Sequence, residues 1–250
     1  MALDDWAGFS KKQPKFCDQL SELWSFAELG SLLPASPILM SAPRGDVHPI
    51  LVIPGLFADD GATMILRRYL QMLGYKAHPW KLGYNPGPCR HTEKLLLARL
   101  DELHARYGQK VSLVGWSMGG VFARELAKDR PDAVRQVITL GSPFRAGYRS
   151  DGRMDEELAE RLREAPASVP CTAVYSRADG IVPWSACRED PSETPDNIEV
   201  PASHFGLAVS PLVLWIVADR LARVTGRLAG VAPTRTVEVA VVDPALSLRL

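Results

Sequence analysis

The sequence predicts an α/β fold in which about six mostly parallel strands form one doubly wound sheet with helices on both faces. Short apolar runs alternate along the chain with longer stretches whose apolar residues recur every three or four positions. The short runs are almost continuously apolar, which is typical of parallel strands that are buried on both faces. The chain has 250 residues, of which 46% are hydrophobic, and this is enough to bury the core of a single domain.

These patterns place the expected elements. Strands are expected at 49–55, 75–80, 110–116, 136–141, 171–176 and 197–202. Helices are expected at 60–73, 92–107, 118–129 and 209–227, because the apolar residues of each stretch share one face.

Three segments lie outside this alternating core. Residues from about 142 to 170 form the longest connection and are expected to be a short lid insertion with a helix at 154–163. Residues 1–48 read as a helical or irregular extension, and the helix expected at 15–33 should pack on the domain rather than on lipid, because its polar face is not strongly basic. The C-terminal tail, about 229–250, alternates like a strand over part of its length and fits an edge strand or a partner contact.

Charge and cysteine content limit the classes of partner. Twenty-nine basic residues balance twenty-nine acidic ones, which gives no bulk charge for binding nucleic acid or an anionic membrane. The first residues lack the apolar core of a signal peptide, and no apolar run approaches the roughly 20 residues of a membrane span, so a cytoplasmic protein is expected. The four cysteines show no metal-binding spacing, so we expect neither a metal nor a cofactor. Free thiols are expected, with a Cys171–Cys187 bridge left open.

The residues from Gly115 to Gly119 read Gly-Trp-Ser-Met-Gly and stand between an expected strand and an expected helix. This is the Gly-x-Ser-x-Gly pattern of a nucleophile elbow, a sharp turn that holds a serine hydroxyl above the carboxyl ends of the strands. Side chains two positions to either side of the serine would collide with the neighbouring strand and helix, and glycine removes that collision. Ser117 is therefore the candidate nucleophile.

A serine nucleophile needs a base and an orienting acid, which follow it in the order acid, then histidine, in the hydrolase version of this pattern. Of the five histidines only His204 follows Ser117, and it comes directly after the last expected strand. Asp179 follows the preceding strand and is expected to hold the imidazole and stabilise its charged form. The competing acids, which read as solvated surface or lid residues, are Glu189, Asp190, Asp196, Asp151 and Asp155.

The negative charge that develops on the substrate oxygen needs N–H donors. The pattern takes one donor from the residue after the nucleophile, here Met118, and one from the loop after the first strand. In that loop Gly55 lets the backbone approach the site, and Leu56 is the expected donor, with Phe57 as the alternative. The Pro-Gly pair at this point would also fit a simple turn.

Together these residues resemble the α/β-hydrolase superfamily, and more closely its bacterial lipase- and esterase-like serine hydrolases. The resemblance covers about residues 49–222 and rests, in family order, on "VIPGLFA", "GWSMGGVFARELA", "ITLGSPF", "YSRADGIVPW" and "SHFGLAV". It implies an α/β-hydrolase fold, trimmed by two leading strands, in which the residues named above form the catalytic triad and the oxyanion hole. Many relatives carry arginine where this chain has Tyr84 in "GYNPGP".

The residues expected around the elbow are apolar or aromatic, which suits acyl chains or polyester segments better than phosphates or acidic substrates. The candidate substrate contacts are Phe57, Trp116, Phe144, Ile181, Val182, Trp184 and Phe205, and Trp116 fits core packing equally well. We therefore expect a serine hydrolase that cleaves carboxylic esters, small or polymeric, through an acyl-enzyme. The alternatives are an acyltransferase or thioesterase with the same triad, and a non-catalytic binding protein with this fold.

Overall fold

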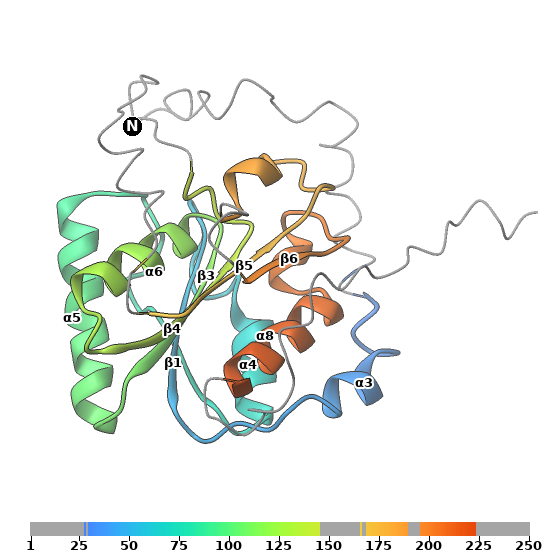
Figure 1. Cartoon of the computed structure of the whole chain (residues 1–250), viewed down its shortest axis with the longest axis horizontal. Helices are drawn as coiled ribbons and strands as arrows, with labels where there is room; N and C mark the ends of the chain where they lie inside the picture. The colour runs from blue at the N-terminus through green and yellow to red at the C-terminus, as the bar shows by residue number, and fades with distance from the viewer. Residues whose placement is uncertain (1–27, 29, 146–165, 167–168, 190–195, 224–250) are drawn as a thin grey trace, which may run out of the picture.

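The computed structural model describes residues 28, 30–145, 166, 169–189 and 196–223 (Figure 1). Within them one sheet has six strands, and every pair of neighbouring strands is parallel. The strands are β1 (Pro49–Ile53), β2 (Lys76–Pro79), β3 (Val111–Trp116), β4 (Val134–Leu140), β5 (Cys171–Tyr175) and β6 (Asp196–Glu199). The α-helices are α3 (Ser36–Met40), α4 (Met64–Met72), α5 (Arg90–Tyr107), α6 (Met118–Asp129) and α8 (Pro211–Arg223), with 3₁₀ turns η3 (Trp184–Ala186) and η5 (Gly206–Ala208).

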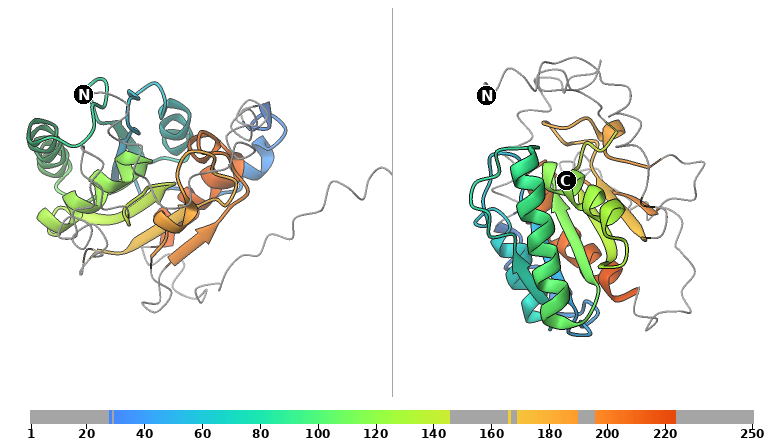
Figure 2. Two further views of the ribbon diagram at one scale, coloured as in Figure 1. Left: turned by 90° about the horizontal axis from the view of Figure 1, so that it is seen from above. Right: turned by 90° about the vertical axis from the view of Figure 1, so that its left-hand side faces the viewer.

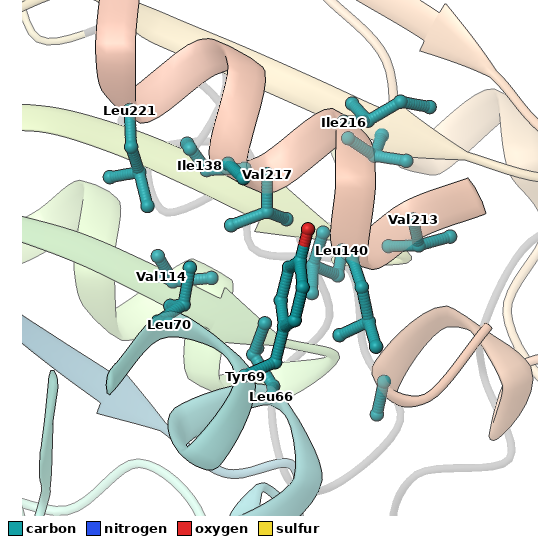
Figure 3. Packing of buried hydrophobic residues seen from close by; sticks show 14 of the residues in the cluster. Leu66, Tyr69, Leu70, Val114, Ile138, Leu140, Val213, Ile216, Val217 and Leu221 are labelled. Atoms are coloured by element: carbon teal, nitrogen blue, oxygen red, sulfur yellow. The ribbon is translucent and has the colours of Figure 1, made fainter. Parts of the chain in front are cut away.

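Helices cover both faces of the sheet (Figure 2). Successive residues of a strand point to opposite faces, so Leu51 and Ile53 of β1 pack with α5 and α6, whereas Ile50 and Val52 pack with α4 and α8. Figure 3 shows the second of these layers, in which side chains of α4 and α8 meet those of β3 and β4. β1 and β3 are buried at every position, which explains why their sequences are continuously apolar.

The strand order is β2-β1-β3-β4-β5-β6, so the chain leaves β1 in one direction toward β2 and then continues from β3 in the other. Ligands of open α/β sheets bind outside the carboxyl ends of the strands at such a switch point. Here the switch lies between β1 and β3, whose carboxyl ends lead into the loop at 54–58 and into Ser117. The topology thus brings the expected oxyanion loop and the expected nucleophile side by side.

The structure confirms the α/β class, the six strands and the helices over both faces, with boundaries that differ from the expected ones by a few residues. Within the described part of the extension at 1–48, α3 is a short helix that contacts α8. The expected helix at 154–163, the C-terminal tail and most of the helix expected at 15–33 lie outside the described residues.

Two further expectations concern thiols and membranes. Cys89, Cys171 and Cys187 are free, so the Cys171–Cys187 bridge that the sequence left open does not form. None of the helices among the described residues has the length and apolar character needed to cross a bilayer.

Candidate active site

Ser117 occupies the turn from β3 into α6. Its backbone has φ 55° and ψ −125°, a strained conformation for a residue with a side chain, and it is the N-cap residue of α6. The Ser117 N–H donates to the Leu140 carbonyl oxygen at 2.8 Å, which fixes the turn against the end of β4. The residue is partly exposed although the strand before it and the helix after it are buried. This is the geometry of a nucleophile elbow.

The glycines around Ser117 are there because backbone passes too close for a Cβ atom. A Cβ at Gly115 would overlap the backbone of Gly119, and a Cβ at Gly119 would overlap the carbonyl of Ile53 in β1. Gly55 is similar, since a Cβ there would lie 3.1 Å from the Ser117 Cβ. The steric reason that the sequence predicted for these glycines is confirmed.

Asp179 and His204 lie next to each other at the carboxyl ends of β5 and β6. The Asp179 Oδ2 and the His204 Nδ1 are 2.7 Å apart, and both side chains are almost fully buried. The other carboxylate oxygen, Oδ1, accepts the N–H groups of Ile181 at 2.9 Å and Val182 at 2.7 Å. With both oxygens held, the carboxylate is fixed where it can accept a hydrogen bond from the Nδ1–H group, which leaves Nε2 free of a proton and able to act as a base.

Two residues bring this pair close to the elbow. The indole N–H of Trp116, the residue before Ser117, donates to the His204 carbonyl oxygen at 3.0 Å, and the two rings are 5.5 Å apart. Gly141 follows β4 with φ 55°, and a Cβ on it would lie 3.1 Å from the Asp179 Oδ2 and 3.4 Å from the His204 Nδ1. Sequence reasoning missed Gly141 as a site residue, although a glycine directly after a buried strand was the available signal.

The loop at 54–58 is tied down by Asn85, a fully buried residue that sequence reasoning also missed. The Asn85 side-chain amide donates to the Pro54 carbonyl at 2.9 Å, and the Asn85 carbonyl accepts the Phe57 N–H at 2.9 Å. The Phe57 N–H, the alternative oxyanion donor in the sequence analysis, is therefore already engaged in a hydrogen bond. Among the hydrogen bonds of the described residues, none uses the Leu56 N–H.

Known proteins share this architecture. No protein-family model matches the chain. A triacylglycerol lipase of Burkholderia plantarii is 29% identical over 133 residues, which are 49% of this chain and 37% of that lipase. Lipase B of Aspergillus fumigatus aligns with a TM-score of 0.56 and 18% identity over 70% of this chain and 52% of its own. The mature form of lipase BlEst2 of Bacillus licheniformis also aligns with a TM-score of 0.56 and 18% identity, over 72% of this chain and 94% of its own.

The chain has the α/β-hydrolase fold. It spans little more than a third of the length of the curated lipase that it resembles in sequence.

Two of the acids that competed with Asp179 for the role of orienting His204 pair with arginine side chains instead. Glu189, expected to be a solvated surface residue, is instead buried and pairs with the buried Arg124 of α6. Asp196 accepts from Arg220 at 2.6 Å. The remaining competitors, Asp151, Asp155 and Asp190, lie outside the described residues.

Among the described cysteines, Cys187 is the one whose thiol is influenced by the charge of Asp179. Burial, together with the negative charge of Asp179, raises the pKa of the Cys187 thiol well above its ordinary value and keeps it neutral. Within the described ranges, no three His, Cys, Asp or Glu side chains are grouped in a way that could hold a metal ion.

Several of the expected substrate contacts are accessible around the carboxyl edge of the α/β-hydrolase sheet. Phe205 directly follows His204 and is 48% exposed, and Ile181 is 46% exposed. Phe57 has a positive φ of 56° and stacks on the exposed ring of Tyr84, with centroids 5.9 Å apart. Tyr84 therefore adds an aromatic face beside Phe57.

Other expected contacts are packed into the protein. Phe144 needs correction, because its ring has no exposed surface and lies 4.0 Å beneath the Arg124 guanidinium, so it is a core residue. Trp116 and Val182 are also buried, and Trp116 forms the support behind His204 described above. Trp184 is half-buried and stacks on Tyr175.

Proposed function

We propose that this chain is a serine hydrolase that cleaves carboxylic esters through Ser117, His204 and Asp179. The observation that carries the proposal is the buried hydrogen bond between Asp179 and His204 at the same sheet edge as the strained turn of Ser117. The likeness to a triacylglycerol lipase and to two solved lipases supports ester hydrolysis as the reaction class.

In the proposed reaction the Ser117 Oγ attacks the ester carbonyl carbon while the His204 Nε2 takes the hydroxyl proton. Asp179 holds the Nδ1–H and stabilises the imidazolium that forms. The imidazolium then gives its proton to the leaving alcohol as the ester C–O bond breaks, and the acyl group stays on Ser117. A water molecule attacks this acyl-enzyme while His204 takes its proton, and His204 returns the proton to Ser117 as the acid leaves.

The oxyanion of the tetrahedral intermediate is assigned to the N–H groups of Met118 and Leu56. Met118 is the first residue of α6, where N–H groups have no partner within the helix. Leu56 follows Gly55, whose backbone passes next to Ser117. Asn85 supports this assignment, because it engages Phe57 and leaves Leu56 as the donor of the loop. Losing one such donor costs about a hundred- to a thousand-fold in rate.

The substrate class is an ester with an apolar acyl group, either a small ester or a segment of a polyester. The residues that follow the strand ends near the site are apolar or aromatic and present no charge to an acidic substrate; they are the half-buried Phe57 and the exposed Tyr84, Ile181 and Phe205.

The test is covalent labelling with a fluorophosphonate, followed by hydrolysis of p-nitrophenyl esters of rising chain length and of a polyester film. The folded wild type should be labelled at Ser117 and should hydrolyse at least one ester, whereas Ser117→Ala should do neither. An acyl-thioester run beside the esters measures the preferred leaving group. A folded wild type that takes no fluorophosphonate label and hydrolyses none of these esters would contradict the proposal.

A further inference from the structure

The loop that carries His204 is held by a carboxylate from the other end of the sequence. The Glu28 Oε1 accepts the Ser203 N–H at 3.1 Å, and the Glu28 Oε2 accepts the Ser203 hydroxyl at 2.6 Å. The second distance is typical of a charge-assisted O–H···O⁻ hydrogen bond. Glu28 thus satisfies both donors of the residue that directly precedes His204.

The same contact shapes the turn after His204. The Ser203 Oγ, while donating to Glu28, accepts the Gly206 N–H at 2.9 Å. Gly206 also lies so close to Glu28 that a Cβ on it would overlap both carboxylate oxygens. Because Ser203 and Gly206 enclose His204, the carboxylate fixes the backbone on both sides of the histidine.

We propose that Glu28 is a positioning residue that aligns His204 for proton transfer during ester hydrolysis. This inference rests on the proposed function. Asp179 fixes the His204 ring through Nδ1, and Trp116 fixes the His204 carbonyl. Glu28 adds control of the backbone from which the ring projects, and misplacement of a catalytic group by about 1 Å can cost about a hundred-fold in rate.

The chemistry of the contact favours a carboxylate in particular. Ser203 is buried, and each carboxylate oxygen of Glu28 accepts one of its two donors. Glutamine has nearly the same shape but only one acceptor oxygen, so its NH₂ group would either face the Ser203 O–H or make the hydroxyl turn to accept, and in both cases the hydroxyl proton loses its partner. Glu28→Gln is therefore expected to disturb the loop without removing any volume.

The experiment compares kcat and KM for a p-nitrophenyl ester in the wild type, Glu28→Gln and Glu28→Ala. Both substitutions should lower kcat by about ten- to a hundred-fold, with KM changed by less than about threefold, because the proton transfer and not the substrate contacts is disturbed. In a Ser203→Ala background, Glu28→Gln should cost much less, since one acceptor oxygen then matches the single remaining donor. That rescue is not expected of a residue that only adds stability.

Tyr69→Phe is the matched control. The Tyr69 hydroxyl donates to the Leu39 carbonyl at 3.0 Å, so it also ties the N-terminal part of the chain to the domain, but away from His204. Tyr69→Phe should lower the melting temperature without lowering kcat. An equal loss of kcat in Tyr69→Phe, or a Glu28→Ala variant within about twofold of the wild type, would overturn the proposal.

Hydrogen–deuterium exchange separates this proposal from the proposed function. Peptides covering 203–207 should exchange faster in Glu28→Gln than in the wild type and no faster in Tyr69→Phe, whether or not the protein hydrolyses esters. Unchanged exchange in Glu28→Gln contradicts the positioning role even in an active enzyme. A wild type that is inert toward esters and fluorophosphonate contradicts the proposed function instead.

Discussion

The two ends of the sheet carry the same three residue types in different surroundings. At the carboxyl end Asp179 binds His204 beside the turn of Ser117. At the amino end the His48 Nε2 lies 2.8 Å from the Ser112 Oγ, and the His48 Nδ1 contacts Asp46. This second arrangement joins a serine, a histidine and an aspartate through the two ring nitrogens of His48. Contact among these three residue types is therefore not enough to indicate a reactive site.

The surroundings of Ser112 and Ser117 distinguish the two arrangements. Ser112 lies within β3, where its neighbours pair with β1 and β4, and neither Ser112 nor His48 has any exposed surface. The Gln136 side-chain amide donates to the Ser112 hydroxyl at 3.4 Å, and the Arg135 guanidinium donates to Asp46 at 2.9 Å. No substrate can reach that buried hydroxyl, and Ser112 lies inside β3 and does not itself cap a helix whose free N–H groups could face it. Ser117 differs in both respects, because it is partly exposed and caps α6.

Replacing each histidine by glutamine tests this comparison with the largest expected effect. His204→Gln should lower kcat by about 10³-fold or more, because the proposed base is lost. His48→Gln should leave kcat within about threefold, yet lower the free energy of unfolding by about 1–3 kcal/mol, because buried partners lose a hydrogen bond. Ester hydrolysis measured well below the melting temperature of each variant, together with denaturant unfolding, checks both outcomes. A large loss of kcat in folded His48→Gln would mean that the amino-end cluster matters for chemistry.

A smaller effect is expected from substituting Asn85, which holds the loop at 54–58 at the carboxyl end of the sheet and, with it, the proposed oxyanion donor. Asn85→Ala removes the hydrogen bond to the Pro54 carbonyl and should lower kcat about ten- to a hundred-fold, since the Leu56 N–H loses its position. Asn197→Ala is the control, because the Asn197 side chain also bonds backbone, accepting the Glu189 N–H and donating to the Glu189 carbonyl, but from the edge strand β6 and not to the loop at 54–58. Steady-state kinetics of both variants decide the point, and equal losses would show that Asn85 acts through general stability.

Local patterns were enough to predict the sheet and the order of the candidate triad. β1 and β3 are buried on both faces, so their burial appears directly as continuous apolar sequence. Ser117 lies in a short sequence pattern whose glycines avoid a local steric clash. The proximity of Asp179 and His204 follows from the parallel sheet, because both residues come after strands whose carboxyl ends lie at the same edge. Their catalytic roles stay predictions.

What the sequence could not predict are contacts between residues far apart in the chain. Glu28 meets Ser203 across 175 positions, and Arg124 meets Glu189 across 65, and no periodicity records either pairing. Glu189 stands in a polar, proline-rich stretch that reads as surface, and only the pairing with Arg124 explains its burial. Phe144 was mistaken for a pocket residue for the same reason, since the guanidinium that covers it comes from α6.

The smallest expected effect is a pH dependence of stability to which His48 at the amino end of the sheet and His78 within the edge strand β2 contribute. Burial, together with the charge of Arg135, lowers the pKa of His48 below its ordinary 6.5, although Asp46 opposes the shift. Burial, with the charge of Arg99, likewise lowers the pKa of His78 to about 4. A histidine whose folded pKa is depressed binds protons more weakly in the folded state, so its contribution to stability is complete above pH 6.5 and is lost as the pH falls below that value toward 4.

Denaturant unfolding at about pH 8, 6.5 and 5 should therefore show the wild type losing on the order of 1 kcal/mol of unfolding free energy across the acidic step. His48→Gln should be less stable than the wild type at about pH 8 but should lose less on acidification, because one of the two histidines no longer titrates. Tyr69→Phe serves as the control and should keep the wild-type slope, because burial raises the pKa of Tyr69 to about 12 and the variant leaves His48 and His78 in place. A His48→Gln slope as steep as that of the wild type would assign the acid sensitivity to other groups and leave the amino-end cluster with a packing role alone.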